Sequence, residues 1–168
     1  MKRCNIILIV TVILFNLGLM GCSNQEIKNP VNFYYVRNEY TYGSSDSVII
    51  AEIHEFADPS NLAGLVSHYL KGPQSSEHAS LFPIGTKLVS AKHNENSVSI
   101  VLTDQIVRLT DASLTLACTC LAKTIMDYTG IETVNVYADG TLISGKTMLT
   151  IREDDIILID SGIADSQN

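Results

Sequence analysis

The run Leu70-Lys71-Gly72-Pro73 and, after a polar gap, the run Leu81-Phe82-Pro83-Ile84-Gly85-Thr86-Lys87-Leu88 decide how the middle of this chain folds. Glycine adopts the positive φ that ends a helix, and a proline directly after it cannot extend one. An amphipathic segment therefore stops at Gly72, and a strand-like segment starts after Thr86. Residues 74–80 between the runs are mostly polar and show no apolar period. The sequence predicts a corner that joins a helix to a sheet, with no evident catalytic group.

The residues before this corner predict two strands and one helix. Residues 33–36 and 47–53 are rich in β-branched and aromatic side chains, which favour strands. Asp58-Pro59-Ser60 offers an N-cap and a proline for a first helical turn. A single apolar stripe follows on the predicted helix, formed by Leu62, Leu65, Val66, Tyr69 and Leu70.

The residues after the corner predict mostly hairpin-joined strands and a second helix. Strands are expected at 87–93, 97–102, 132–137, 141–144 and 156–159, with a frayed tail at 161–168. Thr110-Asp111 caps the second helix and Gly130 closes it. The expected fold class is α+β, a mostly antiparallel sheet with two helices packed on one face.

The first residues indicate export. Lys2 and Arg3 precede an apolar run at 6–15, and Leu19-Met20-Gly21-Cys22 ends it. This is the pattern of a bacterial lipoprotein signal peptide at 1–21, in which Cys22 is the lipidated residue. The alternative is an uncleaved transmembrane anchor with an incidental cysteine. Either reading places the rest of the chain outside the cytoplasm and at a membrane.

Charge and length describe what remains after cleavage. Removing Lys2 and Arg3 changes the formal net charge from −7 to −9, which disfavours nucleic acid and anionic lipid surfaces. Membrane attachment is then expected from acyl chains. Residues 22–32 are expected to be a tether and residues 33–160 a single domain. Cys118 and Cys120 lie two positions apart in a helical pattern, so no disulfide between them is expected.

A family resemblance rests on an ordered set of residues from Phe33 to Gly145. The set includes Leu65, Leu70, Gly72-Pro73, Leu81, Pro83, Gly85-Thr86, Leu88, Val98 to Thr103, Thr124, Gly130, Val134, Val136 and Asp139-Gly140. In this order they resemble the GerM-type (GerMN) domain of sporulation and spore-germination lipoproteins. The resemblance implies a non-enzymatic module of the cell envelope, a fold similar to ring-building motifs, and docking onto envelope or spore-assembly proteins.

Motifs with possible chemistry are weak. Residues 140–147 fit the G-x-x-x-x-G-K-[ST] phosphate loop, but only eight residues separate them from the next apolar run, too few for a crossover helix. His54, His68, His78 and His93 fall in four segments and are expected to be solvated or in loops. The acidic run 153–155 either holds a cation or forms a solvated turn. We therefore expect no catalytic residue, metal, cofactor or nucleotide.

One feature of the second helix suggests a partner site. On a helical wheel Leu116 and Cys120 lie one turn apart on the outer face, with Lys123 and Asp127. They predict either a partner-binding patch or ordinary surface residues.

The sequence thus favours a lipid-anchored, non-enzymatic interaction or scaffold domain at the extracytoplasmic face of the cell membrane. The alternatives are a lipoprotein that binds a small ligand or glycan, and a small hydrolase.

Overall fold

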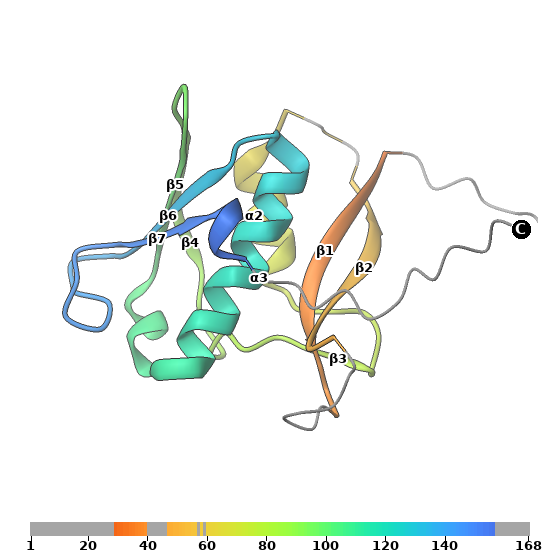
Figure 1. Ribbon diagram of the computed structural model, residues 1–168, viewed down its shortest axis with the longest axis horizontal. Coiled ribbons are helices and arrows are strands. Elements are labelled where there is room, and N and C mark those ends of the chain that lie inside the picture. The colour runs from red at the N-terminus through yellow and green to blue at the C-terminus, as the bar shows by residue number, and fades with distance from the viewer. Residues whose placement is uncertain (1–28, 40–46, 57, 59, 157–168) are drawn as a thin grey trace, which may run out of the picture.

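The computed structural model describes residues 29–39, 47–56, 58 and 60–156, and Figure 1 shows helix α3 lying between two β-sheets. The helices are α2 (Leu62–Tyr69) and α3 (Asp111–Thr129), and η1 (Asp104–Arg108) and η2 (Glu153–Asp155) are short 3-10 helices. The strands are β1 (Pro30–Arg37), β2 (Ile49–Glu55), β3 (His78–Ala79), β4 (Leu88–His93), β5 (Val98–Leu102), β6 (Thr133–Ala138) and β7 (Leu149–Arg152).

The two sheets differ in how their strands are connected. The three-stranded sheet has the order β2-β1-β3 and is antiparallel throughout. The four-stranded sheet has the order β4-β5-β6-β7, in which only β5 and β6 run parallel. That parallel pair requires a crossover, and α3 supplies it. The predicted α+β class with mostly antiparallel strands is confirmed.

Helix α3 is buried on more than one side because both sheets pack against it. Leu121, Ala122 and Ile125 are fully buried, as are Val98, Ile100, Val134 and Val136 on the four-stranded sheet. Gly130 ends the helix at φ 71°, and its N–H donates to the Met126 carbonyl at 2.8 Å. A helix that is apolar over most of its circumference is what such a position requires.

The predicted corner is confirmed, but the helix before it starts at a different N-cap from the one predicted. Helix α2 begins after Asn61, whose side chain accepts the Gly64 N–H at 2.7 Å, rather than at Asp58-Pro59-Ser60. Gly72 has φ 91°, and its N–H donates to the Tyr69 carbonyl at 3.0 Å. Helix α2 thus ends at Tyr69, and the turn that follows it closes at Gly72, where the sequence predicts the amphipathic segment to stop.

One predicted strand is wrong. Residues 141–143 lie between two tight turns, at Asp139-Gly140 and Ser144-Gly145, which are closed by isolated bridges from Ala138 to Thr141 and from Ile143 to Lys146. Positive φ values at Gly140, Ser144 and Gly145 break the extended run. The antiparallel partner of β6 is β7 instead.

The ends of the predicted domain also need adjustment. Strand β1 begins at Pro30, so residues 30–32 belong to the sheet rather than to the predicted tether at 22–32. Most of the strand expected at 156–159, and the tail at 161–168, lie outside the described residues.

Candidate functional site

The most densely hydrogen-bonded polar group inside the three-stranded sheet is the Glu52 carboxylate. Oε1 accepts the Gln74 backbone N–H at 2.8 Å, and Oε2 accepts the Ser75 N–H at 3.1 Å. His78 Nδ1 lies 2.5 Å from Oε2. His54 Nε2 lies 2.6 Å from Oε1, although its ring is not oriented to hydrogen-bond to it. We call these five residues the Glu52 cluster; it fastens the loop after α2 to β2.

Aromatic rings surround this cluster. The His54 imidazole stacks on Phe33 at 4.3 Å between ring centroids, and His68 meets His54 edge-on at 5.5 Å. Tyr35 and Tyr69 stack nearby at 4.9 Å. The expectation that the histidines are solvated or in loops is wrong for His54, which lies within strand β2 and is 2% exposed. The only sequence signal is that Glu52 and His54 are two apart and so share one face of a strand.

The electrostatics make this cluster a structural clamp. Burial raises the pKa of Glu52, but the hydrogen bonds from Gln74, Ser75 and His78 and the charge of His54 outweigh it, so the pKa lies below its ordinary value. Burial also lowers the pKa of His68, assisted by the positive charges of His54 and Lys71. The one hydroxyl of the cluster, Ser75 Oγ, accepts the Glu77 N–H at 3.2 Å, and among the described residues it makes no hydrogen bond to His54 or His78. Among the described residues no group of three or more His, Cys, Asp or Glu is arranged to hold a metal ion.

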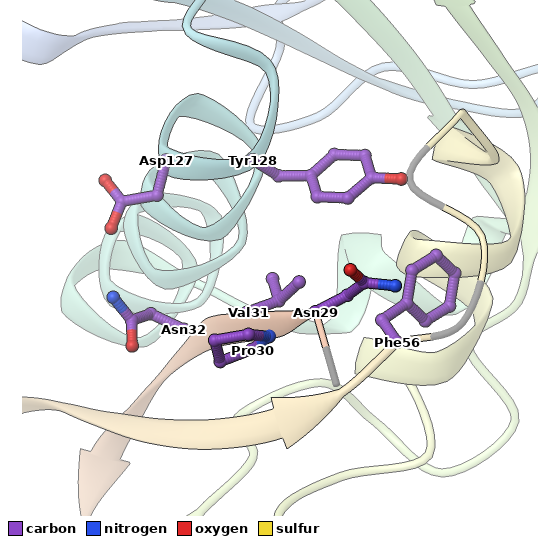
Figure 2. Close-up of a pocket in the computed structure, with 7 residues that line it drawn as sticks. All are labelled: Asn29, Pro30, Val31, Asn32, Phe56, Asp127 and Tyr128. Atoms are coloured by element: carbon purple, nitrogen blue, oxygen red, sulfur yellow. The ribbon is translucent and has the colours of Figure 1, made fainter. Parts of the chain in front are cut away.

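A surface pocket of about 410 Å³ lies where β1 begins, beside the end of α3 (Figure 2). Phe56 and Tyr128 form its aromatic side, and Asn32 and Asp127 lie on the opposite side (Figure 2). The remaining lining residues are Asn29, Pro30 and Val31.

Two polar groups of this pocket, the Tyr128 hydroxyl and the Asp127 carboxylate, are already hydrogen-bonded to neighbouring residues. The Tyr128 hydroxyl donates to the Asp58 carbonyl at 3.0 Å, and the Tyr34 hydroxyl donates to Asp127 at 2.5 Å. Lys123 bridges Asp127 at 2.8 Å and Glu153 at 3.2 Å. Burial, together with the hydrogen bond to Asp127, raises the pKa of Tyr34 to about 12. This network pairs Asp127, the one carboxylate among the residues that line the pocket, with Lys123 and Tyr34.

The helical wheel places Leu116 and Cys120 on the exposed face of the helix, but the structure does not. Cys120 is 1% exposed, and Leu116 is half-buried against the core. The wheel assumes one buried face, whereas α3 is covered by both sheets. Burial also raises the pKa of Cys120 to about 12, as it does for Cys118. Neither residue forms a surface patch, and the two cysteines are free.

The segment 140–147 does not have the surroundings of a phosphate loop. A phosphate loop leads into a helix whose N-terminus binds the phosphates. Here the segment leads into strand β7 and then into the three-residue η2.

Cys22, the predicted lipidation site, lies outside the described residues, and its modification stays a prediction. Neither α2 nor α3, the α-helices of the described part of the chain, is long and apolar enough to cross a bilayer.

Together the fold and these sites define an α+β domain that surrounds a central helix with two sheets and whose polar clusters serve structure. Residues 32–144, more than half of the chain, match the family described as "Germane: Sporulation and spore germination". The chain belongs to this Germane family.

Solved structures of the same class share the fold. The tandem GerMN domains of the sporulation protein GerM from Bacillus subtilis match with a TM-score of 0.57 and 16% identity, covering 79% of this chain and 48% of that one. The chain therefore spans about half of the tandem structure. The first GerMN domain of GerM from Bacillus subtilis matches with a TM-score of 0.53 and 9% identity, covering 73% of this chain and 95% of that one. No curated protein sequence matches this chain.

Proposed function

We propose that this protein is a lipid-anchored interaction domain that works on the extracytoplasmic face of the cell membrane, in envelope assembly during sporulation or germination, and carries out no catalysis. The observation that carries the proposal is the order of two features along the chain. A lipoprotein-type ending at Cys22 comes just before a Germane-family domain whose first strand starts at Pro30.

The short spacing between anchor and domain supports this proposal. Eight residues from Cys22 to Pro30 span at most about 28 Å when fully extended. The end of the domain that holds the pocket of Figure 2 would then stay close to the lipid headgroups. A net charge of −9 after signal removal gives no electrostatic attraction to an anionic membrane, so the acyl chains would provide attachment.

The anchor is tested by replacing the proposed acceptor. Cys22→Ala should abolish incorporation of an alkyne-labelled fatty acid and release the protein from the membrane fraction. Cys4→Ala is the matched control, because that residue leaves with the signal peptide and should change neither result. Fatty-acid labelling that survives Cys22→Ala, or an unlabelled wild-type protein in the cytosol, would contradict the proposal.

The interaction role is tested by cross-linking in intact cells. Growing and sporulating cells that carry the wild-type protein are treated with a lysine- and carboxylate-reactive reagent, and the captured proteins are identified. Recovery of the same envelope proteins from wild type, and their loss with Cys22→Ala, supports an anchored scaffold. Equal recovery from both variants would show that anchoring is not part of the function.

A second candidate is a binder of a small ligand or glycan, favoured by the aromatic pair Phe56 and Tyr128 beside amide side chains in the pocket. Such a ligand should raise the unfolding temperature of the wild-type protein, and Phe56→Ala should remove that increase. A glycan panel that leaves the unfolding temperature unchanged would eliminate this candidate.

A further inference from the structure

The open edges of the two sheets are not protected equally. Strand β4 carries a register shift between Leu88 and Ser90 and the exposed Lys92, two devices that discourage edge pairing. Strand β7 is only four residues long and ends in Arg152. Strand β2, at the end of the three-stranded sheet, runs for seven residues without a register shift against β1.

The far edge of β1 is protected by helix side chains. The Tyr34 N–H donates to the Thr124 hydroxyl at 2.9 Å, and the Tyr34 carbonyl accepts the Tyr69 hydroxyl at 2.9 Å. In Figure 1, β1 lies between α3 and β2, which leaves β2 on the outer side of the sheet. Among the described residues, the edge of β2 therefore has none of the protections found on the other strands.

The direction of the β2 backbone groups follows from the ladder. The Arg37 N–H donates to the Val48 carbonyl at 2.9 Å, which makes Ile50, Glu52 and His54 the residues that hydrogen-bond to β1. Ile49, Ala51, Ile53 and Glu55 then point their N–H and C=O groups away from the sheet. Within the described chain, the hydrogen bond found at these outward groups is from Ser47 Oγ to the Ile49 carbonyl.

The side chains of the same outward residues form a small apolar surface. They lie on the sheet face opposite Glu52 and His54, because side chains alternate along a strand. Ile53 is 58% exposed, Ala51 is exposed and Ile49 is partly exposed. An exposed isoleucine on an open edge is the combination that promotes strand pairing.

We propose that β2 pairs antiparallel with β2 of a second copy of this chain, around a two-fold axis at Ala51. Ile49 then lies opposite the partner's Ile53, and Ala51 opposite the partner's Ala51. These pairs would form about six backbone hydrogen bonds and join the two small sheets into one. Glu55 falls opposite the partner's Ser47, so no like charges face each other. Shifting the register by two in one direction would place Glu52 opposite its own copy, which is unfavourable. Shifting it by two in the other direction would place Ile49 opposite the partner's Ala51 and Ile53 opposite the partner's Ser47, which separates the paired isoleucines.

This arrangement is compatible with anchoring at Cys22, and in that respect it rests on the proposed function. Standard strand spacings place the two Pro30 residues about 30 Å apart, at opposite ends of the shared sheet. Tethers that reach about 28 Å each allow both copies to attach to one membrane when the two-fold axis lies along the membrane normal. Confinement to a membrane would also raise the local concentration of the two copies.

The test is thiol cross-linking of the full-length protein in membranes. Ala51→Cys places two thiols across the axis, with Cβ atoms about 5.5 Å apart, within reach of a short bismaleimide. Cys118 and Cys120 are buried and stay in the thiol form, so they do not compete. Val89→Cys, an exposed apolar position on the edge strand β4, is the matched control, and the unsubstituted chain measures the background.

A product of twice the chain mass from Ala51→Cys, absent from Val89→Cys, is the expected result. Adding Ile53→Lys should reduce that product about ten-fold, because it places a charge on the pairing edge. Only monomer, or a cross-link to a different protein, would overturn the pairing. Ala51→Pro gives a second measurement: it removes an outward N–H without touching the ladder to β1, so the purified detergent-solubilised protein should sediment as a monomer while the wild type sediments as a dimer.

The two proposals fail separately. A membrane-anchored chain that yields only monomer overturns the β2 pairing and leaves the anchor intact. A chain without a lipid that still forms the Ala51→Cys product overturns the anchor and leaves the pairing intact.

Discussion

The two sheets pack against the same central helix but are held in different ways. The four-stranded sheet presents fully buried apolar residues to the helix, among them Ile100 and Val136. The three-stranded sheet places Glu52 and His54 on its inner face beside Phe33 and Tyr35. Apolar burial does not depend on pH but depends on close packing, whereas a buried carboxylate needs every one of its hydrogen-bond donors. A change of pH should therefore disturb the three-stranded sheet more than the four-stranded one. Loss of side-chain volume should disturb the four-stranded sheet more.

The largest effect should come from the four-stranded sheet. Ile100→Ala removes a fully buried side chain and leaves a cavity, so we expect a loss of about 3 kcal/mol in the free energy of unfolding. Urea unfolding followed by circular dichroism measures it. Val101→Ala, on the opposite face of the same strand, is the control, and an equal loss there would contradict the packing described.

A smaller loss is expected from the Glu52 cluster. Glu52→Gln keeps the shape but turns an amide N–H₂ toward a backbone donor, leaving one Gln74 or Ser75 N–H without its acceptor. We expect a loss of about 2 kcal/mol. Glu55→Gln, exposed on the same strand, should change the unfolding free energy by less than about 0.5 kcal/mol. Equal effects of the two substitutions would show that the cluster contributes no stability.

The hydrogen bond between β1 and α3 should contribute less to the free energy of unfolding than the Glu52 cluster does. Thr124→Val keeps the volume but removes the hydroxyl that accepts the Tyr34 N–H and donates to the Cys120 carbonyl. A loss of about 1 kcal/mol is expected. Amide hydrogen exchange gives a sharper readout, because the Tyr34 amide should exchange faster while amides of β5 keep their protection. Unchanged Tyr34 exchange would contradict the role of this hydrogen bond.

The smallest effect should be a pH dependence from Glu52 in strand β2 and from His68, the helix α2 residue that packs against Phe33 and His54. The pKa values of His68 and Glu52 are both lower in the folded chain than their ordinary values of 6.5 and 4.5. The unfolded chain then binds protons first as the pH falls, so stability is lost below pH 6.5 through His68 and below pH 4.5 through Glu52. Unfolding temperatures measured between pH 8 and pH 4 should fall, and less steeply in His68→Gln. Identical slopes for wild type and variant would refute the His68 contribution.

Local signals in the sequence predicted the elements better than their assembly. Gly130 ends α3, and Gly72 closes the turn after α2, each through a positive φ of its own backbone, so both stops could be predicted without tertiary information. The division into two sheets depends on pairing between distant segments, which no local period reports. Cys120 was misplaced for the same reason: its burial is decided by β1, far away in the chain. Ser144 adopts a φ of 50°, which ends any strand there. The strand-favouring residues before it gave no sign of this turn, so residues 141–144 were predicted as a strand.

The candidate site follows the same pattern. The Glu52 carboxylate binds backbone groups 22 and 23 residues further along the chain, and side-chain identity alone does not predict such contacts. The patch predicted at Leu116 and Cys120 is not exposed, because a helical wheel assumes one buried face and α3 is covered by two sheets.

The hydrogen bond from Tyr34 to Thr124 joins residues 90 positions apart, and it has a consequence for the order in which the protein is assembled. Strand β1 is made early, but the helix that protects its edge is completed only when most of the chain exists. Until then the strand has an open side that can pair with other chains.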